Sequence, residues 1–174
     1  MSNVSQFIGS GWVPLETIEL TGAVNTVDFD SNIDDTFNNY VVTGTHTLSI
    51  NTAAIYCKLK TGDPSATINA GYRFLQTYPS SITNNSTNTP SSFARISLYS
   101  GSFIAYFMNL RSSDQFKSIV TQATGYLTSS GIMSVWDYTN ALLDTSIING
   151  IQIYPSSGDI NTGSKFTLYG IKEL

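Results

Sequence analysis

Apolar residues recur at every second position in short runs along this chain, and this period restricts its fold more than any other feature. The runs 27–30, 55–60 and 94–99 all show the alternation. Successive side chains of a β-strand point to opposite faces, so a period of two predicts strands that place one face on a core. In the run 55–60 the same alternation predicts that Lys58 and Lys60 both face solvent.

Turn-forming residues separate these runs. Asn149-Gly150 lies between two short apolar runs, and Asn-Gly is a strong hairpin signal because both turn positions need positive φ angles. The segment 80–92 consists almost entirely of Ser, Thr and Asn, which predicts one long exposed loop. Helical periodicity is nearly absent, and the segment 113–122 fits either a single helical turn or a strand.

The composition agrees with short strands joined by many loops. Charged residues make up only 11% of the 174 residues. Ser, Thr and Asn together make up roughly a third, whereas surface helices would need more Glu, Lys and Arg. We count about ten or eleven candidate strands at short spacing, which is typical of a two-sheet sandwich or a barrel. The chain has the length of one ordinary domain, and no linker or charged run divides it.

Charge and hydropathy argue against two classes of partner. The net charge is −4, and the 8 lysines and arginines are scattered rather than clustered, so a nucleic-acid surface is not expected. No stretch approaches the ~20 apolar residues of a membrane span, and residues 1–11 lack the pattern of a signal peptide. We therefore expect a protein made in the cytoplasm that binds neither nucleic acid nor membrane. The single cysteine, Cys57, cannot form an intrachain disulfide and is expected to be a buried thiol.

The densest acidic cluster, from Asp28 to Asp35, begins like a calcium-binding loop, with oxygen ligands at its first, third and fifth positions. It then departs from that pattern, because Ile33 stands where the loop needs glycine and Asn39 where it needs a bidentate glutamate. A solvated loop after a strand is the favoured interpretation, and a metal site of another geometry is the alternative.

No arrangement of residue types points to catalysis. His46 is the only histidine and lies among threonines on a predicted strand, which suggests a hydrogen-bonded residue rather than a general base. Two acids flanking a groove could cleave a glycosidic bond, but nothing singles out a pair among the available acids. Those acids are Glu16, Glu19, Asp114, Asp137 and Asp144. We predict no catalytic residue, no metal ligand and no cofactor, and a protein that is not an enzyme.

Aromatic residues are plentiful, and exposed tyrosine and tryptophan side chains can stack on sugars or anchor a protein interface. Packing in the core and on strand faces accounts for most of them. Tyr72, Tyr78 and Tyr99 lie on or next to polar faces, so they are the candidates for surface contact.

Three stretches, taken in order, resemble a known family. They are 12–18 with 22–24, 27–29 with 33–40, and 148–151 with 158–171. Together they resemble a family of jelly-roll-like β-sandwich domains found in tail fibres, head fibres and capsid decoration proteins of tailed phages. The resemblance extends from Trp12 to Lys172, and residues 163–171 are its most specific part. It implies an all-β, single-domain, jelly-roll-like antiparallel β-sandwich over residues 12–174, with an N-terminal arm or frayed terminus at 1–11.

The matching positions carry fold roles only. They are Trp12, Gly150, Gly163, Phe166, Leu168, Tyr169 and Gly170. Gly163 permits a turn into the last strand. Phe166 and Leu168 share a face that should fill the core, and Tyr169 should point the other way. Gly170, inside a strand, predicts a bulge or a close backbone approach.

The resemblance implies a non-enzymatic virion structural protein. Fibre relatives carry such a domain behind a long stalk, but only residues 1–11 precede Trp12 here and they show no heptads, which favours a capsid decoration or cement protein. Such a protein would stabilise the head by contacts with the major capsid protein or other virion proteins, would form a homotrimer, and would reside in the virion. The alternative is a receptor-binding module of a tail or head fibre that holds a host surface sugar. A carbohydrate-active enzyme is disfavoured by the missing acid pair.

Overall fold

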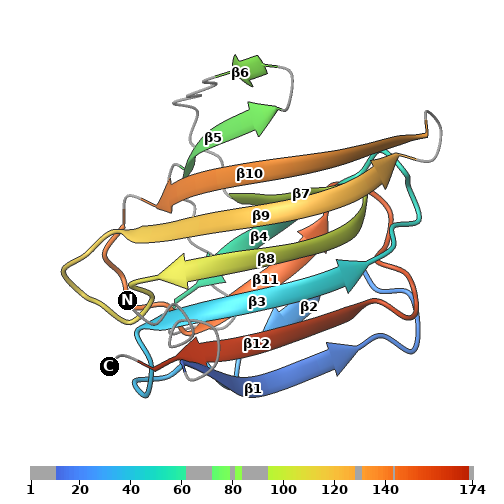
Figure 1. Ribbon diagram of the computed structural model, residues 1–174. Helices are drawn as coiled ribbons and strands as arrows, with labels where there is room; N and C mark the ends of the chain where they lie inside the picture. The colour runs from blue at the N-terminus through green and yellow to red at the C-terminus, as the bar shows by residue number, and fades with distance from the viewer. Residues whose placement is uncertain are drawn as a thin grey trace, which may run out of the picture.

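The computed structural model of the protein describes residues 11–61, 72–78, 81–83, 94–127, 131–142 and 144–172. In these residues the chain forms strands and no helix, and the strands make two antiparallel sheets that pack face to face (Figure 1). The strands are β1 (Trp12–Glu19), β2 (Val27–Phe29), β3 (Asn39–His46), β4 (Ala54–Lys60), β5 (Tyr72–Tyr78), β6 (Ser81–Thr83), β7 (Ala94–Leu98), β8 (Ser100–Met108), β9 (Lys117–Leu127), β10 (Ile132–Leu142), β11 (Gly150–Pro155) and β12 (Lys165–Ile171). The predicted all-β sandwich is confirmed.

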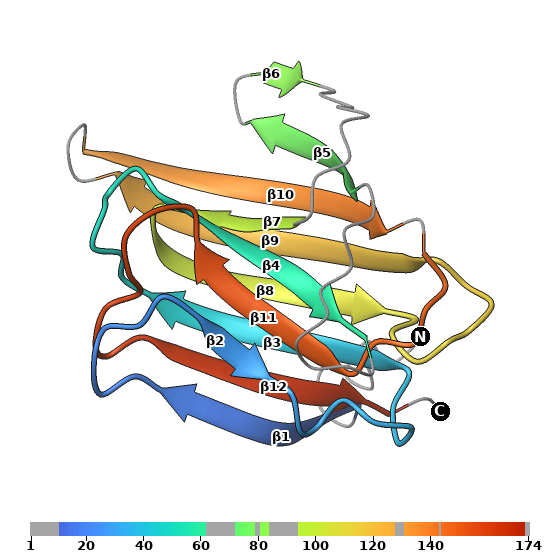
Figure 2. The same ribbon diagram turned by 180° about the vertical axis from the view of Figure 1, so that it is seen from behind.

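The strand order is that of a jelly roll with one extended sheet. The large sheet has the order β1-β12-β3-β8-β9-β10-β5-β6, and the small sheet, nearer the viewer in Figure 2, has the order β2-β11-β4-β7. The four strands β1-β12-β3-β8 and the small sheet together form the two facing sheets of a jelly roll, between which the chain alternates. The β9–β10 hairpin and the β5–β6 pair lengthen the large sheet beyond β8.

The core lies between the two sheets and is formed by their inward faces. In β12, Phe166 and Leu168 are fully buried, whereas Tyr169 is half-buried on the outer face of the large sheet. These three orientations are the predicted ones, because a strand sends alternate side chains to opposite faces.

The segment 113–122, which fitted either a helical turn or a strand, is extended from Lys117 onward as part of β9. Ile119 is buried there and Val120 is exposed, which is the strand period. Of the predicted loop 80–92, the structure describes only Ser81–Thr83. These three residues form β6, so the loop prediction is wrong for them, and the rest of it lies outside the described residues.

The predicted hairpin at Asn149-Gly150 is wrong. Residues 144–149 form no strand and connect β10 in the large sheet to β11 in the small sheet. The Asn149 amide donates a 2.8 Å hydrogen bond to the carbonyl of Lys60 instead of closing a turn. Gly150 starts β11, and its small size serves packing, because a Cβ there would lie 2.6 Å from a carboxylate oxygen of Asp30.

The solvent-facing orientation predicted for both lysines of β4 holds for only one of them. Lys58 is half-buried, with its ammonium group 5.2 Å from the centre of the Tyr154 ring. Lys60 is buried and lies beside Gly150, where its side chain fills the space that a Cβ would need. Its Nζ reaches Asp28 at 2.6 Å. A glycine on the neighbouring strand therefore lets a lysine lie flat across the sheet, which alternation alone does not predict.

Two glycines of the closing pattern have geometric reasons. Gly163 has a φ angle of +82°, which residues with a side chain rarely adopt. This is as expected for the turn that leads into β12. At Gly170 a Cβ would lie 2.5 Å from the ring of Phe37. The register of β12 against β3 continues without a shift at this point, so Gly170 marks a close approach rather than a bulge.

Candidate functional surface

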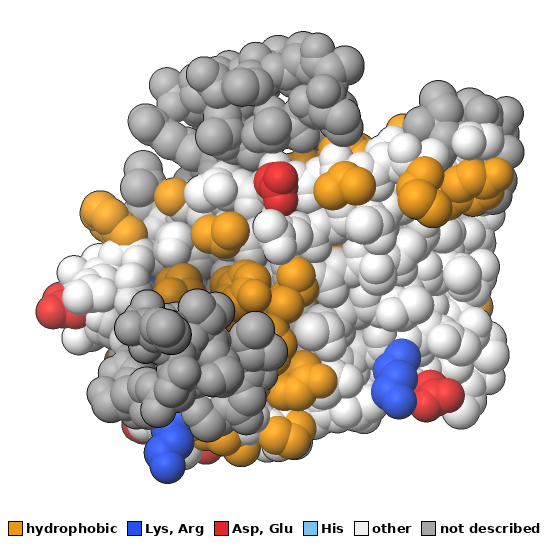
Figure 3. Space-filling view, viewed as in Figure 1, with side chains coloured by type: hydrophobic (Ala, Val, Ile, Leu, Met, Phe, Trp, Pro, Cys, Tyr) orange, Lys and Arg blue, Asp and Glu red, His pale blue; other side chains and the backbone are white. Residues whose placement is uncertain are grey.

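The outer face of the large sheet carries apolar and neutral polar side chains and few charges (Figure 3). On this face Lys165 and Glu19 lie opposite each other on β12 and β1, with 3.8 Å between Nζ and Oε2. Asp137 is the only acidic residue among those that line the two described depressions of this face. A sheet face with few charges is suited to contact with another surface or with a neutral ligand.

One end of this face holds five aromatic and apolar side chains, which we call the aromatic patch: Trp12, Pro14, Tyr106, Val120 and Tyr169. Strand register places all of them except Trp12 in one row across β1, β12, β3, β8 and β9, in which β3 contributes the buried Val41. The Trp12 ring packs against both tyrosines, with centroid distances of 5.9 Å to Tyr106 and 5.6 Å to Tyr169. Trp12 nevertheless remains 41% exposed. The patch is therefore preformed and partly open.

An open depression of about 480 Å³ lies beside the aromatic patch, toward the other end of the strands, and we call it the hydroxyl depression. Its outward side chains are Ser102 and Ile104 from β8, Gln122 and Thr124 from β9, and Val135 and Asp137 from β10. The hydroxyl groups of Ser102 and Thr124 are 2.9 Å apart and share a hydrogen bond. A second depression of about 380 Å³ shares Ser102 and Phe103 with the first. Its other lining residues are Thr43, Gly44, Thr45, Lys165 and Thr167.

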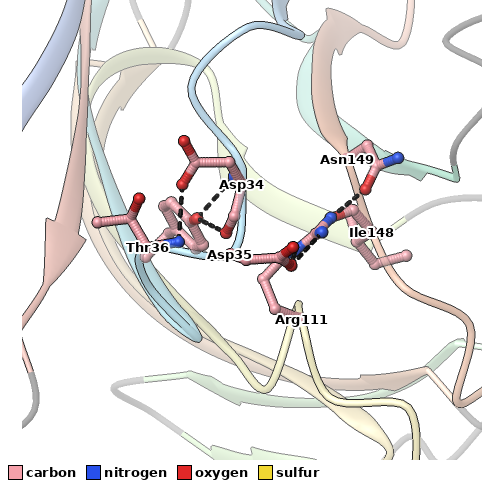
Figure 4. Close-up of polar contacts among 7 residues, drawn as sticks. Asp34, Asp35, Thr36, Arg111, Ile148 and Asn149 are labelled. Carbon is pink, nitrogen blue, oxygen red and sulfur yellow. Dashed lines mark hydrogen bonds and ion pairs between the residues drawn. The ribbon is translucent and has the colours of Figure 1, made fainter.

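The acidic cluster does not converge on one point. Asp28 and Asp30 both bind the ammonium group of Lys60. Asp34 accepts a 2.9 Å hydrogen bond from the backbone amide of Thr36 (Figure 4), and this bond lowers the pKa of the Asp34 carboxyl group. Among the described residues, no group of three or more His, Cys, Asp or Glu side chains could hold a metal ion.

Arg111 ties the end of the acidic segment to the chain that leads into β11 (Figure 4). Its guanidinium group binds the carboxylate of Asp35. It also donates a 3.1 Å hydrogen bond to the carbonyl of Ile148 and a further one to the side-chain oxygen of Asn149. The acidic segment is therefore cross-linked to neighbouring elements by two cations, and its contacts are those of a structural loop.

His46 and Cys57 are buried in different sheets. His46, on β3, packs against the rings of Phe103 and Phe166, and its Nε2 hydrogen-bonds the carbonyl of Tyr99 at 2.8 Å. Burial lowers the pKa of His46 to about 4. Cys57, on β4, is fully buried, and burial raises the pKa of its thiol. The predictions of a hydrogen-bonded histidine and a buried, unpaired cysteine are confirmed.

The acids considered for glycoside cleavage come from separate parts of the fold. Glu16 and Glu19 lie in β1, Asp114 between β8 and β9, Asp137 in β10, and Asp144 between β10 and β11. Glu16 accepts a 3.0 Å hydrogen bond from Asn32, and Asp144 accepts one of 2.6 Å from the amide of Ser146. Only Asp137 lines a described depression, so neither depression contains an acid pair.

Of the three tyrosines proposed for surface contact, the structure describes the side chain of one. Tyr99 is half-buried at the turn between β7 and β8, with a φ angle of +61°. Its ring meets the ring of Trp136 edge-on at 5.3 Å. Tyr72 and Tyr78 belong to β5, and their side chains lie outside the described residues.

Sequence reasoning missed both the aromatic patch and the hydroxyl depression as assembled surfaces. The available signal was the alternation of side chains along each strand. It places Ile104 and Tyr106 on the outward face of β8 and Gln122 on the outward face of β9. Alternation within one strand does not say which strands are neighbours, so these outward residues could not be joined into one surface.

No helix in the described part of the chain is long and apolar enough to cross a membrane. No protein-family model, no curated protein and no solved structure matches the chain.

Proposed function

We propose that this protein is a non-enzymatic structural protein of a tailed-phage virion, and more narrowly a capsid decoration protein that docks through the aromatic patch. The supporting observation is an uncharged, partly exposed group of aromatic and apolar side chains on the outer face of a hydrogen-bonded sheet. Centres of protein interfaces are depleted in charge and enriched in tyrosine and tryptophan, so the patch has the composition of such a centre.

Trp12 is the proposed anchor of this contact. Its ring is held by Tyr106 and Tyr169 and yet is exposed on one side, so docking would bury apolar area while ordering few side chains. A stable protein interface buries about 1,600 Å² in total, which requires the neutral polar side chains around the patch to form the rim. Such contacts, repeated at many sites on a capsid, would stabilise the head without any catalysed reaction.

The phage assignment rests on the resemblance of residues 12–172 to virion structural domains, and the jelly-roll strand order is compatible with it. Under this proposal the partner is the major capsid protein or another virion protein. The protein would act as a homotrimer and would reside in the virion.

The test of location is the number of copies of this chain per purified virion, measured by quantitative mass spectrometry against the major capsid protein. Hundreds of copies in a simple ratio to capsid subunits would support the decoration role. A dozen copies would assign the protein to the tail or a fibre instead, and absence from the particle would overturn the structural proposal.

The test of the docking surface uses particles that lack the protein, to which purified variants are added back. Trp12→Ala should reduce the fraction bound to particles at least tenfold, because it removes the anchor. Met133→Ala is the matched control, since Met133 is 77% exposed on β10 of the same sheet, outside the patch. Equal binding of the two variants, with unchanged circular dichroism, would reject the aromatic patch as the docking surface.

A further inference from the structure

The hydroxyl depression lies where the jelly roll meets its extension. Ser102 and Ile104 belong to β8, which is the last jelly-roll strand of the large sheet. The other outward lining residues come from the β9–β10 hairpin, which adds two strands beyond β8. A jelly roll of two four-stranded sheets does not need this hairpin. Its presence creates a hollow that the basic fold lacks.

Strand register fixes the lining side chains in two short rows. Ile104, Gln122 and Asp137 lie opposite one another on the three strands. Ser102, Thr124 and Val135 form the second row, next to the first. Each row therefore combines an aliphatic side chain with polar groups, and the backbone hydrogen bonds of three strands hold the whole arrangement.

Two polar groups of the depression have no side-chain partner in the part of the chain that the structure describes. Within the described residues, neither the carboxylate of Asp137 nor the amide of Gln122 has a side-chain hydrogen bond or ion pair. Both residues are exposed and point outward from opposed positions. A carboxylate accepts hydrogen bonds and an amide both donates and accepts them, so the pair offers a mixed set of unused hydrogen-bonding groups.

The lining offers no partner to an anionic group and too few ligands to a metal ion. It contains no lysine or arginine, so nothing in it would pair with an acidic group. It contains a single carboxylate, which is too few ligands for a metal ion. Ile104 and Val135 supply apolar contact area between the polar groups. The ligand that matches this lining is neutral, rich in hydroxyl groups and apolar on one face.

From this chemistry we propose that the hydroxyl depression binds a neutral oligosaccharide. Sugar hydroxyl groups would donate to Asp137 and exchange hydrogen bonds with Gln122, Ser102 and Thr124, and hydrogen bonds to the ionised carboxylate would be the strongest. The apolar C–H face of a pyranose ring would lie on the aliphatic side chains. This function goes beyond virion docking, and the two can be tested separately because the aromatic patch and the depression use different residues of the face.

The second depression extends the proposed site across the sheet. It continues from Ser102 over β3 to β12, and its lining includes three threonines and Lys165. The ammonium group of Lys165 is paired with Glu19 at 3.8 Å. From β10 to β12 the two depressions span four strand spacings, or roughly 19 Å at about 4.8 Å each. This length accommodates several sugar units, so hexasaccharides should bind more tightly than disaccharides.

The experiment titrates the purified full chain with neutral hexasaccharides of glucose, mannose, galactose and N-acetylglucosamine, and follows backbone amide shifts by NMR. At least one probe should bind and shift the amides of Ser102, Gln122 and Thr124. Asp137→Ala and Gln122→Ala should each weaken that binding at least tenfold. Asp114→Ala is the matched control, because it also removes an exposed carboxylate, from the segment between β8 and β9 and outside both depressions, and should leave binding within twofold of the parent.

Two results would overturn the proposal. One is that no probe binds at 10 mM to a chain whose NMR spectrum is that of the folded protein. The other is that a probe binds but shifts amides elsewhere and is insensitive to Asp137→Ala and Gln122→Ala. Neither result would bear on the decoration role, which is decided by the copy number in virions and by the Trp12→Ala particle-binding assay.

Discussion

The ammonium nitrogen of Lys60 lies 2.6 Å from a carboxylate oxygen of Asp28, although Lys60 is only 5% exposed. Asp30 binds the same nitrogen at 3.0 Å. Burial alone would lower the pKa of Lys60, but the hydrogen bonds and charges of both aspartates outweigh it and raise that pKa above its ordinary value. One cation therefore joins the β2 edge of the small sheet to β4, across the glycine of the strand between them.

Lys60→Ala should destabilise the fold because it leaves two neighbouring carboxylates without their cation. Removing one partner of a buried ion pair costs about 3–5 kcal/mol, and we expect about 2 kcal/mol here because both carboxylates are partly exposed. Lys58→Ala, on the same strand, should cost less than about 1 kcal/mol, since the interaction it removes is that of the Lys58 ammonium group with the Tyr154 ring. Urea denaturation of the two variants measures the difference. Equal loss in both would show that the Lys60 bridge contributes no net stability.

The opposed glycines Gly101 and Gly125 should tolerate no side chain. A Cβ on Gly101 would lie 2.0 Å from the carbonyl oxygen of Thr124, and one on Gly125 would lie 2.2 Å from that of Leu98. Both clashes are with backbone, which cannot rotate away. We therefore expect alanine at either position to cost at least about 3 kcal/mol or to prevent soluble expression.

Gly22→Ala is the control for this pair, because no heavy atom lies within 4 Å of a Cβ at Gly22. It should change the free energy of unfolding by less than about 0.5 kcal/mol. The comparison is made by thermal and urea denaturation of the three variants. A Gly101→Ala protein as stable as Gly22→Ala would mean that β8 and β9 can separate locally without loss.

The sequence predicts where the strands of this fold lie in the chain better than it predicts which strands pair with one another. Alternation predicts the buried positions of β12, including Phe166 and Leu168, because it depends only on residues within one strand. The juxtaposition of Trp12 with Tyr106 depends on β12 and β3 being inserted between β1 and β8. Such pairings join segments far apart in the chain, and no local pattern encodes them.

The errors at Lys60 and Asn149-Gly150 have one physical origin. Each prediction used a local rule, the strand period for Lys60 and turn propensity for Asn149-Gly150. In the fold, Gly150 makes room for the lysine side chain and for Asp30, so the three residues are determined together. Tertiary packing overrides both local preferences. The acidic loop is a related case, since Arg111 comes from a distant segment to bind Asp35.

The thiol of Cys57 should be unreactive in the native protein. Cys57 is fully buried, and burial raises its thiol pKa, so both access and the thiolate fraction are low. Labelling with 5,5′-dithiobis(2-nitrobenzoate) at pH 8 should be at least about a hundredfold slower in buffer than in guanidinium, because reaction requires unfolding. Rapid stoichiometric labelling of a protein with native circular dichroism would contradict the burial of this residue.

His46 should make the fold sensitive to mild acid. Its pKa is about 4 in the folded protein, below the ordinary 6.5, because burial disfavours the charged ring. As pH falls below 6.5 the unfolded chain binds a proton that the folded chain does not, so stability decreases until the folded pKa is reached. The free energy of unfolding should therefore decrease by about 3 kcal/mol between pH 7 and pH 4 because of this residue.

Urea denaturation across this range should show a steeper decrease in the free energy of unfolding for the parent than for His46→Gln. The glutamine can still donate to the Tyr99 carbonyl but does not titrate. Identical pH dependence in the two proteins would mean that His46 is protonated in the native state as readily as in the unfolded chain.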